Sequence, residues 1–220
     1  MRVVDLASGK GYLTFAGYSF LKQEGFDPQV IGIERRDALV DLCNGVAREC
    51  GFDQIRFESG EIAQASLSGA DVGIGLRACD TTTDDAIYGG IRSGAEIILT
   101  APCCHTELRP QLQPPAHLAP LFKFGIQMDR MAESITDALR SMYLKASGYH
   151  TRLQESISLE HVEKSADHRI EALRWANGRR SLPAGSEFRE LFGIETPASG
   201  RSLAKAPSRL RTANQPSEDD

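Results

Sequence analysis

Short runs of β-branched and other apolar residues recur along the first half of the chain, with starts roughly 25 residues apart. Stretches with helical periodicity lie between them. Strands that alternate with helices form a parallel sheet that is covered by helices on both faces. The spacing therefore predicts an α/β fold. The runs are Val3–Val4, Val30–Ile33, Ile55–Phe57, Ala70–Ile74 and Ile97–Leu99.

Two stretches repeat apolar residues at the spacing of amphipathic helices. The first stripe is Leu39, Leu42, Cys43, Val46 and Ala47, and the second is Met131, Ile135, Ala138, Leu139 and Met142. We expect Asp37 to cap the first helix, Gly51 to follow it, and the second to end near Gly148. Residues 101–119 are rich in proline and polar residues, which predicts a long loop of functional importance.

The pattern changes after Gly148. Residues 151–159 and 168–175 both have the composition of strands, which predicts an antiparallel hairpin at the end of a mostly parallel, seven-stranded sheet. The expected organisation is one domain over residues 1–178 and a short helical extension over 179–195. A disordered tail rich in proline, serine and arginine is expected over 196–220.

The overall composition excludes several classes of protein. Of the 220 residues, 41% are hydrophobic and 25% are charged, as in ordinary soluble globular chains. No run approaches the roughly 18 apolar residues of a membrane span, and no signal peptide is evident. Five cysteines in a chain too large to need disulfides indicate reduced thiols and a cytoplasmic protein. A net charge of −5 disfavours binding of nucleic acid through bulk charge and leaves room for a local basic groove.

The first predicted strand runs into a glycine-containing turn before a helix. Gly9 and Gly11 would let the backbone approach a ligand, and the free N–H groups of the helix start favour an anionic group. A pyrophosphate-binding turn needs a third glycine at the position of Thr14, so that kind of site is disfavoured. Glu34 ends the second strand and could bind ribose hydroxyls. The turn and Glu34 could also be a simple connection and a solvated carboxylate.

The third strand ends in an acidic turn. Glu58 and Glu61 compete as acceptors for an adenine amino group, and we expect Glu61, which follows Gly60, to fill that role beside Ile62. The alternative is that Glu61 is a surface residue.

These residues together resemble the class I S-adenosylmethionine-dependent methyltransferases, and the terminal hairpin fits their Rossmann-like fold. The resemblance covers residues 2–175. It implies that the first turn holds the methionine end of S-adenosyl-L-methionine and that Glu34 holds the ribose. The sequence departs from the family at Ala7, where glycine is common, and alanine fits this position if its φ is negative. The implied cofactor-binding residues are Asp5, Ala7, Gly9, Gly11, Glu34, Glu61, Ile62 and Asp80.

Two later segments carry a narrower resemblance. Residues 76–84 (LRACDTTTD) and 101–108 (APCCHTEL) look like a methyltransferase-like family with a Pro-Cys-Cys-His signature. Its members include the methyltransferase domain of glutathione S-transferase C-terminal-domain-containing protein. A related Cys-Cys-His signature occurs in a tRNA ribose methyltransferase family. Residues 158–161 also look like a part of the first family.

Cys79 and Cys103 follow neighbouring predicted strands. We therefore expect Cys79, Asp80, Cys103, Cys104 and His105 to converge on the cofactor's methyl group. The expected catalytic residues are Asp80, Cys103, Cys104 and His105, and His161 could share that face. The cysteines could instead be buried packing groups with His105 capping a loop, or they could shape the acceptor pocket. A nucleophilic cysteine and a zinc site are further alternatives. We expect no metal, because adjacent cysteines suit zinc poorly.

The sequence therefore predicts an S-adenosylmethionine-dependent methyltransferase with RNA as the acceptor. Alternatives are a protein methyltransferase, an NAD-dependent oxidoreductase and a binding module without catalysis. Methyltransferases of this class usually carry a helix before the first strand, and here only Met1 and Arg2 precede it. We therefore expect an exposed apolar patch on the sheet there. A partner, a second copy or a further N-terminal segment would cover it.

Overall fold

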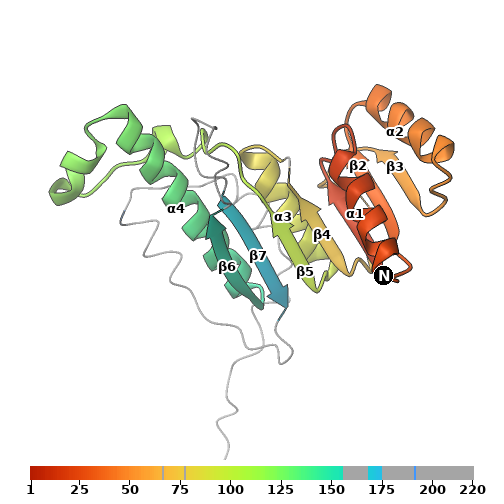
Figure 1. The fold of residues 1–220 in the computed structure, drawn as a ribbon. Coiled ribbons are helices and arrows are strands. Elements are labelled where there is room, and N and C mark those ends of the chain that lie inside the picture. The colour runs from red at the N-terminus through yellow and green to blue at the C-terminus, as the bar shows by residue number, and fades with distance from the viewer. Residues whose placement is uncertain (66, 77, 156–167, 175–190, 192–220) are drawn as a thin grey trace, which may run out of the picture.

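The computed structural model describes residues 1–65, 67–76, 78–155, 168–174 and 191 (Figure 1). These residues form one seven-stranded sheet with the order β3-β2-β1-β4-β5-β7-β6. The strands are β1 (Arg2–Leu6), β2 (Gln29–Glu34), β3 (Ile55–Ser59), β4 (Val72–Gly75), β5 (Ile97–Thr100), β6 (Tyr149–Glu155) and β7 (His168–Arg174). The α-helices are α1 (Tyr12–Gln23), α2 (Asp37–Glu49), α3 (Thr81–Ser93) and α4 (Gly125–Ala146).

The strand pairing confirms the predicted fold class. β1 to β5 run parallel, whereas β7 is antiparallel to both β5 and β6. β2 and β3 follow β1 on one side of it in the sheet. The chain then crosses over, and β4 and β5 lie on the other side of β1. The strand order thus reverses between β1 and β4. In open α/β sheets this reversal leaves a crevice at the carboxyl ends of the strands, where ligands bind.

The alternating residues of β1 explain how the sheet is covered on both faces. Val3 packs with Tyr18 of α1 and Val40 of α2. Val4 packs on the opposite face in a cluster with Ile62, Leu67, Ala70 and Ala86 of α3. Further along the sheet, buried residues of α3, α4 and β5 to β7 form a third cluster that includes Ile87. The α1 and α2 helices lie over one end of the sheet in Figure 1.

The sheet face that carries α1 is less well covered beyond β1. Val72 and Ile74 of β4 are half-buried and pack at the edge of the cluster under α1. Ile97 and Leu99 pair with them in register and are also half-buried, and Leu173 of β7 is 54% exposed. No helix among the described residues lies over this strip. The expected apolar patch was placed beside the first strand, but β1 itself is buried, and the strip lies on β4, β5 and β7 instead. What covers it stays a prediction.

The helix ends follow the sequence signals closely. Gly51 and Gly148, which follow α2 and α4, have φ values of 66° and 90°, as expected for residues beyond a helix end. The expected cap at Asp37 is wrong by one position. Arg36 has the extended backbone of the N-cap, and Asp37 is the first helical residue, whose carboxylate accepts a hydrogen bond from Ser59.

The long segment after β5 is irregular apart from two short 3-10 helices, η1 (Arg109–Gln111) and η2 (Ala116–Phe122). No helix in the described part of the chain is long and apolar enough to cross a bilayer. The expectations for His161, for residues 158–161, for the extension at 179–195 and for the tail at 196–220 lie outside the described residues.

Candidate functional site

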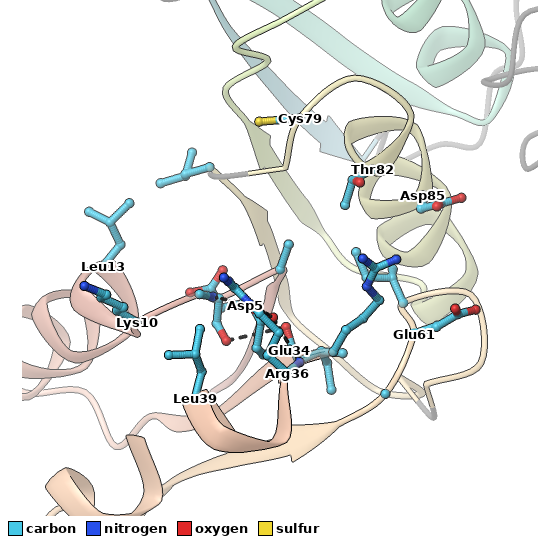
Figure 2. Close-up of a pocket in the computed structure, with 18 of the residues that line it drawn as sticks. Asp5, Lys10, Leu13, Glu34, Arg36, Leu39, Glu61, Cys79, Thr82 and Asp85 are labelled. Carbon is cyan, nitrogen blue, oxygen red and sulfur yellow. Dashed lines mark hydrogen bonds and ion pairs between the residues drawn. The ribbon is translucent and has the colours of Figure 1, made fainter. Parts of the chain in front are cut away.

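A cavity of about 990 Å³ opens at the carboxyl ends of the parallel strands, where the strand order reverses (Figure 2). Its volume is at the upper end of the range for small-molecule sites. Its lining comes from the turn after β1, the end of β2, the turn after β3, and the start of α3. Most of the predicted cofactor-binding residues line it, namely Asp5, Ala7, Gly9, Glu34, Glu61 and Ile62.

The turn after β1 is held in shape by backbone bonds and by one buried side-chain pair. The N–H of Gly11 donates to the carbonyl of Ser8 at 3.0 Å, and the N–H of Ser8 donates to Ile33 of β2 at 3.0 Å. Gly11 has a φ of 70°, and a Cβ at that position would lie 2.9 Å from the Phe57 ring, so only glycine fits there. The turn is therefore a fixed cradle between β1 and α1.

Thr14 has a structural role that explains why the third glycine is missing. Its hydroxyl donates to the Asp5 carboxylate at 2.5 Å, and both side chains are buried. Burial raises the pKa of Asp5 to about 6, and the Thr14 hydrogen bond opposes that rise. Asp5 thus fastens the end of β1 to the first turn of α1.

Ala7 does not have the negative φ that an alanine adopts without strain. Ala7 has a φ of 66°, in the left-handed region that glycine adopts without strain. Its neighbours impose this conformation, because Leu6 must pair with β2 while Ser8 bonds back to Ile33. The backbone at this position must adopt a left-handed conformation, which explains the glycine that is common there in methyltransferases. For alanine this conformation costs about 1–2 kcal/mol.

Glu34 faces the glycine turn at the centre of the cavity. One of its carboxylate oxygens, Oε2, accepts a hydrogen bond from the N–H of Gly9 at 3.0 Å. The other, Oε1, accepts from the N–H and the Nε of Arg36 at 3.1 and 2.8 Å. The Arg36 hydrogen bonds lower the pKa of Glu34, so the carboxylate is ionised at neutral pH. A fixed anionic carboxylate beside a glycine turn suits a pair of ribose hydroxyls.

The two acidic candidates after β3 differ in their surroundings. Glu58 pairs with Arg56 on the exposed strand, at 2.8 Å, whereas Glu61 lines the cavity and is exposed to it. Buried Ile62 follows and adds an apolar wall. This placement agrees with the preference for Glu61 over Glu58, and a contact of Glu61 with an adenine amino group stays a prediction.

Three cysteines meet beyond β4 and β5. The Sγ atoms of Cys79 and Cys103 are 2.7 Å apart, and those of Cys103 and Cys104 are 3.9 Å apart. Cys103 is exposed overall, and partial desolvation of its thiol together with the neighbouring thiols raises its pKa to about 12. Cys79 also lines the cavity, and Figure 2 shows it at the opposite end from Leu39. Of the residues expected to converge, the three cysteines lie together, and of the predicted catalytic residues Asp80, Cys103, Cys104 and His105 none is among the residues that line the cavity. Their meeting at the methyl group stays a prediction.

Asp80 and His105 bond to other groups. The Asp80 carboxylate accepts hydrogen bonds from the Thr106 hydroxyl and from the N–H of Glu107, the latter at 3.1 Å. His105 is almost buried, and its Nε2 lies 3.1 Å from the Oδ1 of Asp137 in α4. Both side chains therefore fasten the loop after β5, and their catalytic assignment stays a prediction.

A buried charge cluster beneath this loop was not anticipated from the sequence. Arg140 of α4 is fully buried and donates to Asp84 at 2.7 Å, to Asp137 at 3.1 Å and to the carbonyl of Asp80 at 2.9 Å. Asp80 has the unusual backbone angles φ 52° and ψ −120° at the start of α3. Arg140 thus helps to hold a strained residue next to Cys79. An isolated arginine within an amphipathic helix gives no sequence signal for such a role.

Comparison with known proteins supports this description. A family model described as a methyltransferase domain matches residues 1–111. The methyltransferase domain of bacterial-CtHen1-CN is 13% identical with a TM-score of 0.50, over 78% of this chain and 89% of that chain. The YcgJ protein from Bacillus subtilis is 12% identical with a TM-score of 0.49, over 79% and 91%. An rRNA methylase from Streptococcus thermophilus is 12% identical with a TM-score of 0.47, over 79% and 86%.

No curated protein sequence matches the chain. The fold is shared with the CtHen1 domain, and the matched residues contain the glycine turn, Glu34 and all three clustered cysteines. Because the match to the family model spans just over half of the 220 residues, the chain belongs to the family of methyltransferase domains.

Proposed function

We propose that this protein transfers the methyl group of S-adenosyl-L-methionine to an acceptor. The observation that carries the proposal is the position of Glu34, an ionised carboxylate 3.0 Å from the backbone N–H of Gly9 at the strand-order reversal. A nucleoside ligand needs such a carboxylate for its ribose and a glycine turn for the attached chain. Membership of the methyltransferase domain family supports a methyl donor rather than a redox cofactor.

The residues around the cavity fit the parts of this cofactor. Glu34 would accept from the ribose hydroxyls, Glu61 and Ile62 would border the adenine, and the turn from Ala7 to Gly11 would hold the methionine end. S-adenosylmethionine supplies an activated methyl group when it is bound. The chain's own contribution is orientation of the acceptor, which can lower the barrier by about 7–11 kcal/mol.

The acceptor that we propose is RNA. Three cationic residues, Lys10, Arg35 and Arg36, line the cavity and could bind phosphate groups despite the net charge of −5. Attraction of this kind weakens steeply with salt, whereas recognition of a protein acceptor through apolar contacts does not.

Methyl transfer from radiolabelled S-adenosylmethionine to RNA-rich and protein-rich fractions of a cell extract tests the proposed activity and the proposed RNA acceptor. We expect label in the RNA fraction that disappears after ribonuclease treatment and falls as the salt concentration rises. Label that survives ribonuclease and disappears after protease treatment would contradict the RNA acceptor while supporting methyl transfer. No label in either fraction, for a protein that binds the cofactor, would contradict the proposed activity.

A further inference from the structure

We propose that Cys79, Cys103 and Cys104 bind one zinc ion at the end of the cavity, a site that goes beyond the proposed methyl transfer. Their three Sγ atoms all lie within 4.8 Å of one another, in the only such group of potential metal ligands among the described residues. Thiolates are the ligands that zinc and other soft ions prefer.

One of the two short sulfur–sulfur distances already fits a shared ion, and the other needs a small adjustment. Zinc–sulfur bonds of about 2.3 Å place two ligands of a tetrahedral site about 3.8 Å apart. The Cys103 and Cys104 sulfur atoms are 3.9 Å apart. The Cys79 and Cys103 sulfur atoms are closer, at 2.7 Å, so this pair must separate by about 1 Å to share the ion. Cys79 and Cys103 are exposed, so a side-chain rotation can open this pair to the zinc-bound spacing.

The fold supplies the ligand that the sequence pattern lacks. Adjacent cysteines alone suit zinc poorly, which is why the sequence predicts no metal. Cys79 follows β4, however, and the adjacent pair follows β5, so the pairing of these two parallel strands brings the third thiol to the same point. The site would therefore tie two strand ends together across the sheet.

The surroundings of the three thiols also favour a fixed site. Asp80, directly after Cys79, is held in its strained conformation by Arg140 on its carbonyl and by the N–H of Glu107 on its carboxylate.

Three protein ligands leave one position of a tetrahedral zinc ion open. Zinc sites with three protein ligands hold water or a substrate in the fourth position, whereas closed structural sites use four protein ligands. Cys79 lines the cavity, so the open position would border it. Binding as three thiolates releases three protons to solvent, which makes the affinity for zinc increase with pH.

Metal binding to the reduced full-length protein tests this site without any cofactor or acceptor. After dialysis against zinc and removal of excess metal, we expect one equivalent of bound zinc by elemental analysis. Cobalt(II) should replace it and give sulfur-to-cobalt charge-transfer absorption with the intense visible bands of tetrahedral coordination. This spectrum is measured on the unchanged protein, so it does not depend on the folding of any variant.

Single variants then assign the ligands. Cys79→Ser and Cys104→Ser should each weaken zinc binding by more than the about 10- to 100-fold that loss of a residue behind the ligands costs, because each removes a direct ligand. Cys50→Ser is the matched control, since Cys50 is exposed and lies after α2, outside the cluster, and it should bind zinc as the wild type does.

Three results would overturn the site. They are the absence of bound zinc after reconstitution, equal binding by the ligand variants and the wild type, and recovery of a disulfide between Cys79 and Cys103 in excess zinc. None of these results bears on binding of S-adenosylmethionine, so the zinc site and the proposed methyl transfer stand or fall separately.

Discussion

The guanidinium of Arg36 lies on the carboxylate of Glu34, with Nε 2.8 Å from Oε1 and Nη2 3.3 Å from Oε2. The two partners are unequal in exposure, because the side chain of Arg36 is 67% exposed and that of Glu34 is 8% exposed. The Glu34 side chain is therefore fixed by its surroundings, whereas the Arg36 side chain can rotate away from it into solvent. The guanidinium occupies oxygen lone pairs that ribose hydroxyls would use, so the cofactor must displace at least part of this pair.

Replacing Arg36 with alanine should therefore strengthen binding of S-adenosylhomocysteine. Because exposed ion pairs are weak, we expect an increase of up to about fivefold in calorimetric affinity. Arg56→Ala is the matched control, since Arg56 forms an exposed pair with Glu58 on β3 and should leave the affinity unchanged. A clear loss of affinity in Arg36→Ala would show instead that Arg36 contacts the cofactor.

Asp5 should make the unfolding free energy depend on pH. Burial raises its pKa from 3.8 to about 6, so the folded state binds a proton that the unfolded state has already lost between these values. The protonated Asp5 side chain therefore makes its full contribution to the free energy of unfolding below about pH 4, and this contribution declines as the pH rises towards 6. At about 1.4 kcal/mol per pKa unit, the decline is about 3 kcal/mol.

The Asp5→Asn variant should lack this decline, because its side chain does not ionise and can still accept from Thr14. Urea unfolding of both proteins at pH 4 and pH 8 measures the effect. We expect Asp5→Asn to gain about 3 kcal/mol relative to the wild type between the two conditions. A constant difference across this range would show that the carboxyl of Asp5 has the same affinity for a proton in the folded and unfolded states.

Ala7→Gly should stabilise the fold by about 0.5–1 kcal/mol, because glycine removes the strain of a left-handed alanine but increases the entropy of the unfolded chain. Ala16→Gly in the exposed part of α1 is the control, and it should destabilise by about 1 kcal/mol. Chemical denaturation distinguishes the two signs. Destabilisation by both substitutions would mean that the turn does not strain Ala7.

The strand and helix positions were accessible from sequence because their signals are local. Every run of β-branched residues in the first half overlaps a strand, although Ala70 and Asp71 precede β4, and the stripe from Leu39 to Ala47 lies within α2. Parallel strands with helical crossovers have few topologies, so the fold class also followed. Ala7 shows the limit of this reasoning. Its φ depends on the simultaneous pairing of Leu6 and Ser8 with β2, which no residue of the turn encodes alone.

The site residues that were predicted best are those at the ends of strands, because the strand fixes the direction in which such a side chain points. Glu34 and Glu61 line the cavity for this reason. His105 lies in the long segment after β5, where direction depends on tertiary partners such as Asp137 of α4. The Arg140 cluster joins residues 56 positions apart, and the short-range patterns used here carry no information about such contacts.

Calorimetric titration of the protein with S-adenosylhomocysteine and with NAD is the most direct test of the central claim, that the cavity is a methyl-donor site with Glu34 as its ribose ligand. We expect S-adenosylhomocysteine to bind tighter than NAD. Glu34→Ala should weaken that binding by roughly 10- to 150-fold, since hydrogen bonds to a charged group contribute about 1.5–3 kcal/mol. Glu58→Ala is the control and should bind as the wild type does. Tighter binding of NAD, or unchanged affinity in a folded Glu34→Ala protein, would contradict the account.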